Sequence, residues 1–423
     1  MDQGSFFILK PIAFLSLHPK DLEIRNFNYE LDPAKIALYP EPERGHSKLL
    51  IWKNGAISED KYINIAKHLP ADSLLVLNET KVIPARILFE KPSGGIIEIF
   101  CLEPFGFEGY AQTLSNTGSA RWKCLIGGAS KWKSGALNKE FIIDNQRVSL
   151  TVTLVQKLPD SFISEFSWSP ASYTFMQIIE ASGGIPLPPY IKRRSDEADK
   201  DRYQTVYANA AGSVAAPTAG LHFTQEIFQS LKEKNIVTSE ITLHIGAGTF
   251  KPVTADKIED HHMHSEWIEV SREAIQAILD HPKEIVAVGT TSIRTLESLY
   301  WMGVKCLLDP FITSEKLNLS QWEIYEAPLS ISNIDAKDAL AHLLKWMKVQ
   351  EKKQLITTTG ILIAPGYHFK LTNALITNFH QPQSTLLLLV AAIAGENWKM
   401  IYDYALESDF KFLSYGDGSL LYI

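Results

Sequence analysis

The sequence predicts a mixed α/β fold with an inserted antiparallel β unit. Continuous apolar runs, LLVL at 74–77 and IVAV at 285–288, are typical of buried parallel strands. From 87 to 160 the chain changes to short alternating segments separated by Gly-Gly and Asp-Asn pairs. We therefore predict a mixed α/β main domain at 21–86 and 161–423, interrupted by a small antiparallel β-barrel at 87–160. Residues 1–20 are expected to form an N-terminal extension.

The helices of the main domain are predicted from their boundary residues. A helix is expected ahead of the strand at 74–77, and another over 169–183 with Ser169 as its N-cap. A third should begin at Thr290 and end near Gly303. An apolar helix should begin after Ser384 and end at Gly395, because Ser favours N-caps and Gly favours helix ends.

Residues 306–355 are predicted to be an addition within the main domain. They show little pattern apart from one amphipathic helix. Its apolar face would contain Leu340, Leu343, Leu344 and Met347. We expect this segment to form an added lobe or arm.

Composition narrows the class of protein. The chain has 423 residues, is 45% hydrophobic and carries a net charge of −7, which argues against a general nucleic-acid coat protein. The apolar run at 386–394 is far shorter than the roughly 20 residues that span a bilayer. Cys101, Cys124 and Cys306 are widely spaced and suggest neither a zinc site nor a disulfide framework. We expect a cytoplasmic protein with no membrane partner.

Three histidines and a glutamate cluster at 261–266 and raise the question of a metal. Imidazole and carboxylate groups are good metal ligands. The spacing of His261, His262, His264 and Glu266 matches no familiar ligand pattern. We therefore expect no bound metal there.

The run VGTTSIRTLE at 288–297 predicts a strand, a tight turn and a helix N-terminus, an arrangement that binds anions. Its hydroxyls, its free N–H groups and Arg294 could hold a carboxylate or a phosphate. The alternative is a capped helix in which Arg294 forms a structural pair with a glutamate. The G-x-G at 246–248 is weak evidence for a nucleotide site, and the nearby His244 could equally be a strand histidine without function.

Several motifs together resemble those of one family. RYQTVYA at 202–208 leads into GSVAAPTAGLHFT at 212–224, a small, turn-rich run that suits a backbone close to a ligand. The other blocks are LNETKVIPAR at 77–86, IPLPPYI at 185–191, LHIGAGTF at 243–250, HMHSEW at 262–267, VGTTSIRTLE at 288–297, PGYHF at 365–369, TNFH at 377–380 and FLSYGD at 412–417. The chain resembles the S-adenosylmethionine:tRNA ribosyltransferase-isomerases of queuosine biosynthesis over 27–300 and 359–421, as a divergent long-form branch.

The resemblance implies a reaction and a set of site residues. The enzyme would transfer and isomerise the ribosyl moiety of S-adenosylmethionine onto 7-aminomethyl-7-deazaguanine at the wobble position of tRNA, giving epoxyqueuosine, adenine and methionine. A base would remove a proton from the carbon beside the sulfonium, and no cofactor would be required. Proton transfer would involve His264, Glu266 and His222. Substrate contacts would come from Thr218, His244, Gly246, Gly248, Thr290, Thr291, Arg294, Asn378, His380, Tyr415 and Asp417.

A basic loop next to an aromatic side chain is the candidate tRNA contact. Tyr190 could stack on an unpaired base, with Lys192, Arg193 and Arg194 beside it. A solvated basic loop is the more frequent meaning of such a run. The expected partners are S-adenosylmethionine and a tRNA with a GUN anticodon, and we expect a monomer.

The chain departs from the family pattern at several positions and carries additional residues between Gly303 and Thr359. The substitutions are Lys48 for Arg, Glu79 for Asp, Lys81 for Arg, Gly360 for Asp, Gln381 for Leu and Gln383 for Lys. These changes leave two alternatives open: a paralogue that uses the same donor on another deazapurine acceptor, and a non-catalytic RNA-binding relative. The intact polar blocks argue against the second, because a scaffold needs only hydrophobic patterning.

Overall fold

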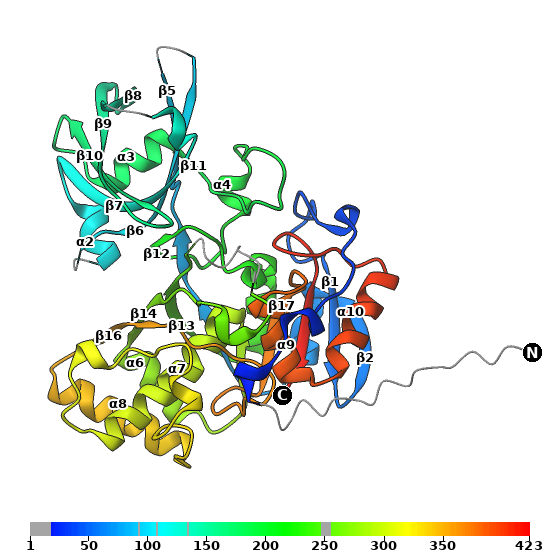
Figure 1. Ribbon diagram of the computed structural model, residues 1–423. Coiled ribbons are helices and arrows are strands. Elements are labelled where there is room, and N and C mark those ends of the chain that lie inside the picture. The colour runs from blue at the N-terminus through cyan, green and yellow to red at the C-terminus, as the bar shows by residue number, and fades with distance from the viewer. Residues whose placement is uncertain (1–17, 92–93, 107–108, 133–134, 247–254) are drawn as a thin grey trace, which may run out of the picture.

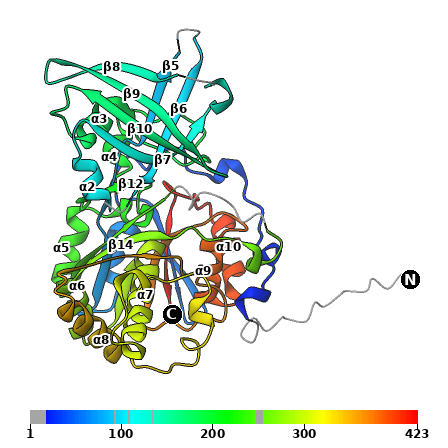
Figure 2. The same ribbon diagram turned by 60° about the vertical axis from the view of Figure 1, so that its left-hand side comes forward.

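The computed structural model describes residues 18–91, 94–106, 109–132, 135–246 and 255–423 (Figure 1). Most of the predicted extension at 1–20 therefore lies outside the described residues. Two sheets dominate the molecule, and Figure 2 shows the smaller, curled sheet above the larger one. Within the described part of the chain, no helix is long and apolar enough to cross a membrane.

The main sheet is mixed, and its centre is parallel. Strands β13, β3, β15 and β17 run parallel to one another, with antiparallel β14 and β16 on one side and β18, β1 and β2 on the other. Across the sheet the order is β16 (Gln354–Thr359), β14 (Glu266–Ser271), β13 (Val237–His244), β3 (Leu74–Asn78), β15 (Ile285–Val288), β17 (Ala374–Asn378), β18 (Gly418–Tyr422), β1 (Lys48–Lys53) and β2 (Ala56–Lys61).

Helices cover both faces of this sheet because successive strand side chains point to opposite sides. Leu74 and Val76 belong to the core beneath α6 (Arg272–Asp280), α7 (Thr290–Leu308) and α8 (Ala336–Val349). Leu75 and Leu77 belong to the core with α1 (Ile65–His68) and α5 (Gln225–Glu233). Helices α9 (Thr385–Ala394) and α10 (Asn397–Glu407) enclose a third core against β1. The mixed α/β class predicted from the sequence is confirmed.

The second sheet is antiparallel and curls into a half-barrel. Its order is β11 (Gly183–Gly184), β5 (Arg86–Glu90), β6 (Ile96–Pro104), β7 (Ser119–Gly127), β10 (Phe162–Ser169), β9 (Gln146–Lys157) and β8 (Leu137–Ile143). Its core includes α2 (Gly109–Ser115) and α3 (Phe175–Ser182). The Phe175 ring lies 5.2–5.6 Å from the rings of Phe166, Trp122 and Trp168. The sheet ends at β8 and β11, so the predicted barrel is open, and α3 packs into its core.

Two helix boundaries differ from the sequence prediction. Helix α3 begins after Thr174, whose side chain forms a capping box with Gln177, and Ser169 instead ends β10. Helix α7 continues past Gly303 to Leu308, and this glycine lies where α8 packs against α7: a Cβ at Gly303 would lie 2.2 Å from the carbonyl oxygen of Ala339. The predicted cap of α9 is correct, since Ser384 accepts a hydrogen bond from the Leu387 N–H.

Helix α8 is packed into the main body. It lies against α6 and α7, and its residues Leu340, Leu343 and Met347 are buried in the same core as β3. The amphipathic helix predicted within 306–355 is therefore present, and it covers part of the main sheet (Figure 1). This segment does not project from the body as an arm would.

Candidate active site

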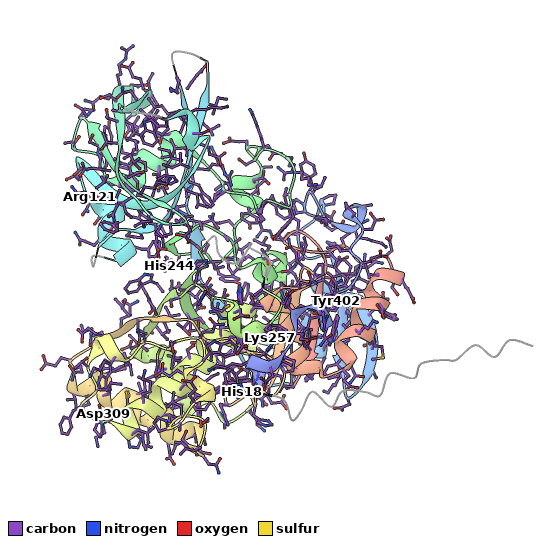
Figure 3. All side chains as sticks on the ribbon, viewed as in Figure 1. His18, Arg121, His244, Lys257, Asp309 and Tyr402 are labelled. Atoms are coloured by element: carbon purple, nitrogen blue, oxygen red, sulfur yellow. The ribbon has the colours of Figure 1, made fainter. Side chains whose placement is uncertain are left out.

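A cleft of ≈ 700 Å³ lies between the half-barrel and the main sheet. The C-terminal end of β13, the start of β14 and the N-terminus of α7 supply its main-body wall, and β6, β7 and α2 supply the other. Figure 3 shows His244 at this junction. The predicted site residues that line the cleft are His244, Gly246, His264, Glu266, Thr290, Thr291 and Arg294. Ligand sites in α/β proteins favour such ends of parallel strands.

A buried ion pair between Glu266 and Arg294 lines the cleft. Each residue is only 6% exposed, and Arg294 Nη1 donates to Glu266 Oε2. Arg294 Nε donates to the carbonyl oxygen of Ile361 at 3.2 Å. Within the described residues, the buried Nη2 has no partner. The structural pair considered for Arg294 therefore exists, and Arg294 also lines the cleft.

The N-terminus of α7 lies beside this pair. Gly289, at φ 90, turns the chain from β15 into the helix, so that Thr290 and Thr291 line the cleft. Asn78 fixes this turn: its Nδ2 donates to the carbonyl oxygen of Leu243 at 3.0 Å and to Thr291 Oγ1 at 3.2 Å. The free N–H groups of a helix N-terminus favour a bound anion.

His244 joins the two walls of the cleft. Its ring centroid lies 4.3 Å from that of Tyr110 on α2, and Nδ1 lies 3.2 Å from Thr80 Oγ1. Gly212 makes room for both rings, because a Cβ there would lie 2.7 Å from Tyr110 and 2.8 Å from His244. The close approach at Gly212, in the motif expected to lie near a ligand, is thus an approach to two side chains of the protein. His244 is buried and has partners, as a strand histidine would, and it also lines the cleft.

The histidine segment at 261–264 lies at the mouth of the cleft. His264 is exposed there, whereas His261 is half-buried. Burial, followed by the neighbouring His264 and His262, lowers the pKa of His261 from its usual value. Among the residues described, no group of three or more His, Cys, Asp or Glu side chains is arranged to hold a metal ion.

A second cavity of ≈ 80 Å³ lies behind the cleft and shares Thr290 and Thr291 with it. Thr218, Asn378, His380 and Tyr190 line this rear cavity. Asn378 accepts from Thr218 Oγ1 at 2.7 Å, and its Nδ2 lies 3.3 Å from His222 Nε2.

His222 and His380 are both buried, and burial lowers the pKa of each. Burial lowers the pKa of His380 to about 3, and burial, followed by the charges of Arg44 and Arg202, lowers that of His222 to about 3. The His222 ring stacks on Tyr62 at 4.3 Å. His222 lines a small third cavity with Arg44, Arg202 and Tyr415, so the structure does not bring it into the cleft with His264 and Glu266.

The remaining predicted residues form internal contacts or lie at the surface. Arg193 makes a bidentate pair with Asp199 at 2.7 Å, and Tyr415 donates to the same carboxylate at 2.7 Å. Asp417 accepts from the backbone N–H groups of Lys48 at 2.6 Å and Lys411 at 2.7 Å. Lys192 and Arg194 are exposed. Gly248 lies outside the described residues.

Sequence reasoning missed the half-barrel wall and one buried acid. Leu102, Glu103, Tyr110, Lys123 and Leu125 line the cleft from β6, α2 and β7, and no local motif marked them. Glu297, the last residue of VGTTSIRTLE, is fully buried and accepts hydrogen bonds from Tyr367, from Thr372 and from the backbone of 370–372. Its position three residues after Arg294 was the available signal that the motif also organises the loop after PGYHF.

Comparison with known proteins identifies the class of protein. The family model described as "Queuosine biosynthesis protein" matches residues 24–421. The chain therefore belongs to this family of queuosine biosynthesis proteins.

The relatives narrow this class. Proteins from Pelobacter propionicus (35% identical over 408 residues) and Halothermothrix orenii (38% over 409) are each named S-adenosylmethionine:tRNA ribosyltransferase-isomerase. The matches cover 94% and 95% of this chain and 99% and 100% of those proteins. A crystal structure of the S-adenosylmethionine tRNA ribosyltransferase from Thermotoga maritima is 26% identical, with a TM-score of 0.43, covering 93% of this chain and 99% of that one. The family resemblance predicted from the motifs is confirmed.

Proposed function

We propose that this enzyme transfers and isomerises the ribosyl moiety of S-adenosylmethionine onto 7-aminomethyl-7-deazaguanine at the wobble position of tRNA, as the names of its relatives suggest. Adenine and methionine leave, and epoxyqueuosine remains in the tRNA. The tRNA carries a GUN anticodon, and the enzyme acts as a cytoplasmic monomer.

The observation that carries the proposal is the Arg294 guanidinium, buried in the cleft with one unused donor beside the N-terminus of α7. The donor S-adenosylmethionine has a carboxylate, a primary ammonium ion and a sulfonium. A planar guanidinium and a helix N-terminus both suit a carboxylate. We assign the methionyl carboxylate to Arg294, Thr290 and Thr291, which orients the sulfonium toward the mouth of the cleft.

Proton transfer is assigned to the histidine segment. The carbon beside the sulfonium is acidified by the positive sulfur, and an imidazole in its neutral form can accept its proton. His264 lines the cleft and is accessible, which suits this role. Glu266 is held by Arg294 and acts with it in positioning the donor. His222 supports the site from behind through Asn378.

The test is to incubate the purified protein with S-adenosylmethionine and tRNA that bears the aminomethyl-deazaguanine, followed by mass spectrometry of digested nucleosides and an assay for adenine. Epoxyqueuosine with a matching amount of adenine is the expected result. Adenine without modified tRNA would indicate another acceptor. If neither epoxyqueuosine nor adenine forms, the proposal is contradicted.

A further inference from the structure

The half-barrel wall of the cleft presents a carboxylate that the assignments above do not use. Glu103 on β6 and Lys123 on β7 are register partners, and Lys123 Nζ lies 3.0 Å from Glu103 Oε1. Their side chains are 34% and 28% exposed, so both are half-buried. This pair lines the cleft from the wall opposite Glu266 and Arg294.

A β-bulge directs Glu103 into the cleft. The register passes from Cys101↔Cys124 directly to Glu103↔Lys123, which leaves Leu102 as an extra residue on β6. Neighbouring side chains of a regular strand point to opposite faces. Here Leu102 and Glu103 are neighbours, and both line the cleft. Bulges commonly re-aim a side chain beside an active site.

A contact from α2 holds this bulge, and α2 in turn packs against the main body. Tyr110 donates from its hydroxyl to the carbonyl oxygen of Leu102 at 3.3 Å, and its ring lies against His244. Burial raises the pKa of Tyr110, and the carboxylates of Glu103, Glu266 and Glu269 raise it further. Carboxylates from both walls of the cleft therefore act on the pKa of the same phenol.

The chemistry of Glu103 suits a cation from the substrate. Lys123 occupies Oε1, and within the described part of the chain Oε2 has no hydrogen-bond partner. The other carboxylates of the cleft differ: Asp160 and Asp260 are exposed, and Glu266 is bound to Arg294. A half-buried carboxylate with a spare oxygen can accept a charge-assisted hydrogen bond from a primary ammonium ion, roughly twice as strong as a neutral one.

We propose that Glu103 recognises the cationic aminomethyl group of the acceptor base and thereby selects the tRNA that carries it. This inference rests on the proposed function and extends it: the half-barrel wall holds the acceptor, and the main-body wall holds the donor. The bulge at Leu102 then serves specificity, because it turns the carboxylate toward the bound base.

The test compares Glu103→Gln with the matched variant Glu165→Gln. Glu165 pairs with Arg121 at 2.9 Å across β10 and β7 of the same sheet and does not line the cleft. Each protein is titrated with tRNA bearing 7-aminomethyl-7-deazaguanine and with tRNA in which a neutral nitrile replaces the aminomethyl group. The wild type and Glu165→Gln should prefer the cationic base by about 10- to 100-fold, whereas Glu103→Gln should lose this preference.

Further measurements separate this inference from folding defects and from the proposed function. Glu103→Asp keeps the charge and should retain part of the preference, and none of the variants should change the KM for S-adenosylmethionine. A preference that persists in Glu103→Gln, or is absent from the wild type, would overturn the role of Glu103. A wild type that shows the binding preference but forms no epoxyqueuosine would instead contradict the proposed reaction and leave base recognition standing.

Discussion

Two groups of motif residues lie on either side of Thr290 and Thr291, and they differ in how completely their bonds are satisfied. The front group, Glu266 and Arg294, faces the cleft and has an unused donor. The rear group, centred on Asn378, is satisfied by its neighbours: Nδ2 of Asn378 contacts His222 and the carbonyl oxygens of Gly416 and Asp417 at 3.3–3.4 Å. A motif side chain with an unused hydrogen-bond donor is a candidate for substrate contact. A motif side chain whose donors and acceptors are all bonded within the protein more plainly holds the fold together. Substitutions in the front group should therefore lower activity, whereas substitutions in the rear group should change stability and leave activity close to that of the wild type.

The largest effect is expected for Arg294→Met, which removes the guanidinium that binds the buried carboxylate of Glu266. The free energy of unfolding should fall by about 3–5 kcal/mol. Turnover should fall by more than about 100-fold, because the donor carboxylate loses its charged hydrogen bond. The double variant with Glu266→Gln should recover most of the stability in urea titrations but not the activity. Full turnover in either variant would contradict the claim that the front group is needed for activity.

His264→Ala should lower turnover by about 100- to 10,000-fold, the usual contribution of a positioned acid or base. Because this side chain is exposed, the melting temperature should not change. His262→Ala is the matched control, since that imidazole is also exposed and lines the cleft. If the control lost turnover instead, the base would be His262.

Asp417→Asn tests the rear group through pH. Burial raises the pKa of Asp417 from 3.8 to about 6. Its stabilising contribution is therefore fully present below pH 3.8 and is lost as the pH rises through 6, which amounts to about 3 kcal/mol. Urea midpoints measured from pH 4 to 7 should show this decline in the wild type relative to Asp417→Asn. Parallel pH profiles for the two proteins would show that the carboxyl does not titrate in this range.

The smallest effect is expected for His222→Phe, which keeps the ring stacked on Tyr62 but removes Nε2. Loss of one hydrogen bond should lower the free energy of unfolding by about 1 kcal/mol. Turnover should stay close to that of the wild type, as measured by adenine release. A large loss of turnover without a change in the free energy of unfolding would support the proton-transfer role that the sequence predicted for His222.

The fold was predictable where its signals were local. The apolar runs of β3 and β15, the cap at Ser384 and the turn at Gly289 depend on neighbouring residues in the sequence. The end of α7 was not predictable from local sequence, because the contact between Gly303 and Ala339 joins segments that are distant in the sequence. The main-body wall of the site was predictable because its residues form compact motifs. Glu103 was not, because a bulge and the docking of the half-barrel determine where it points.

The position of β18 has a consequence for synthesis on the ribosome. This strand spans Gly418–Tyr422 and lies between β17 and β1, so a segment translated after all the other described strands fills an interior place in the main sheet. The half-barrel strands from β5 to β10 are contiguous in sequence and can pair while the chain is still emerging, because short loop closures are entropically cheap. A ribosome that stalls before β18 is translated would release a chain with a formed half-barrel and a gap in its main sheet. Two unpaired strand edges would then be open to aggregation or to a quality-control protease.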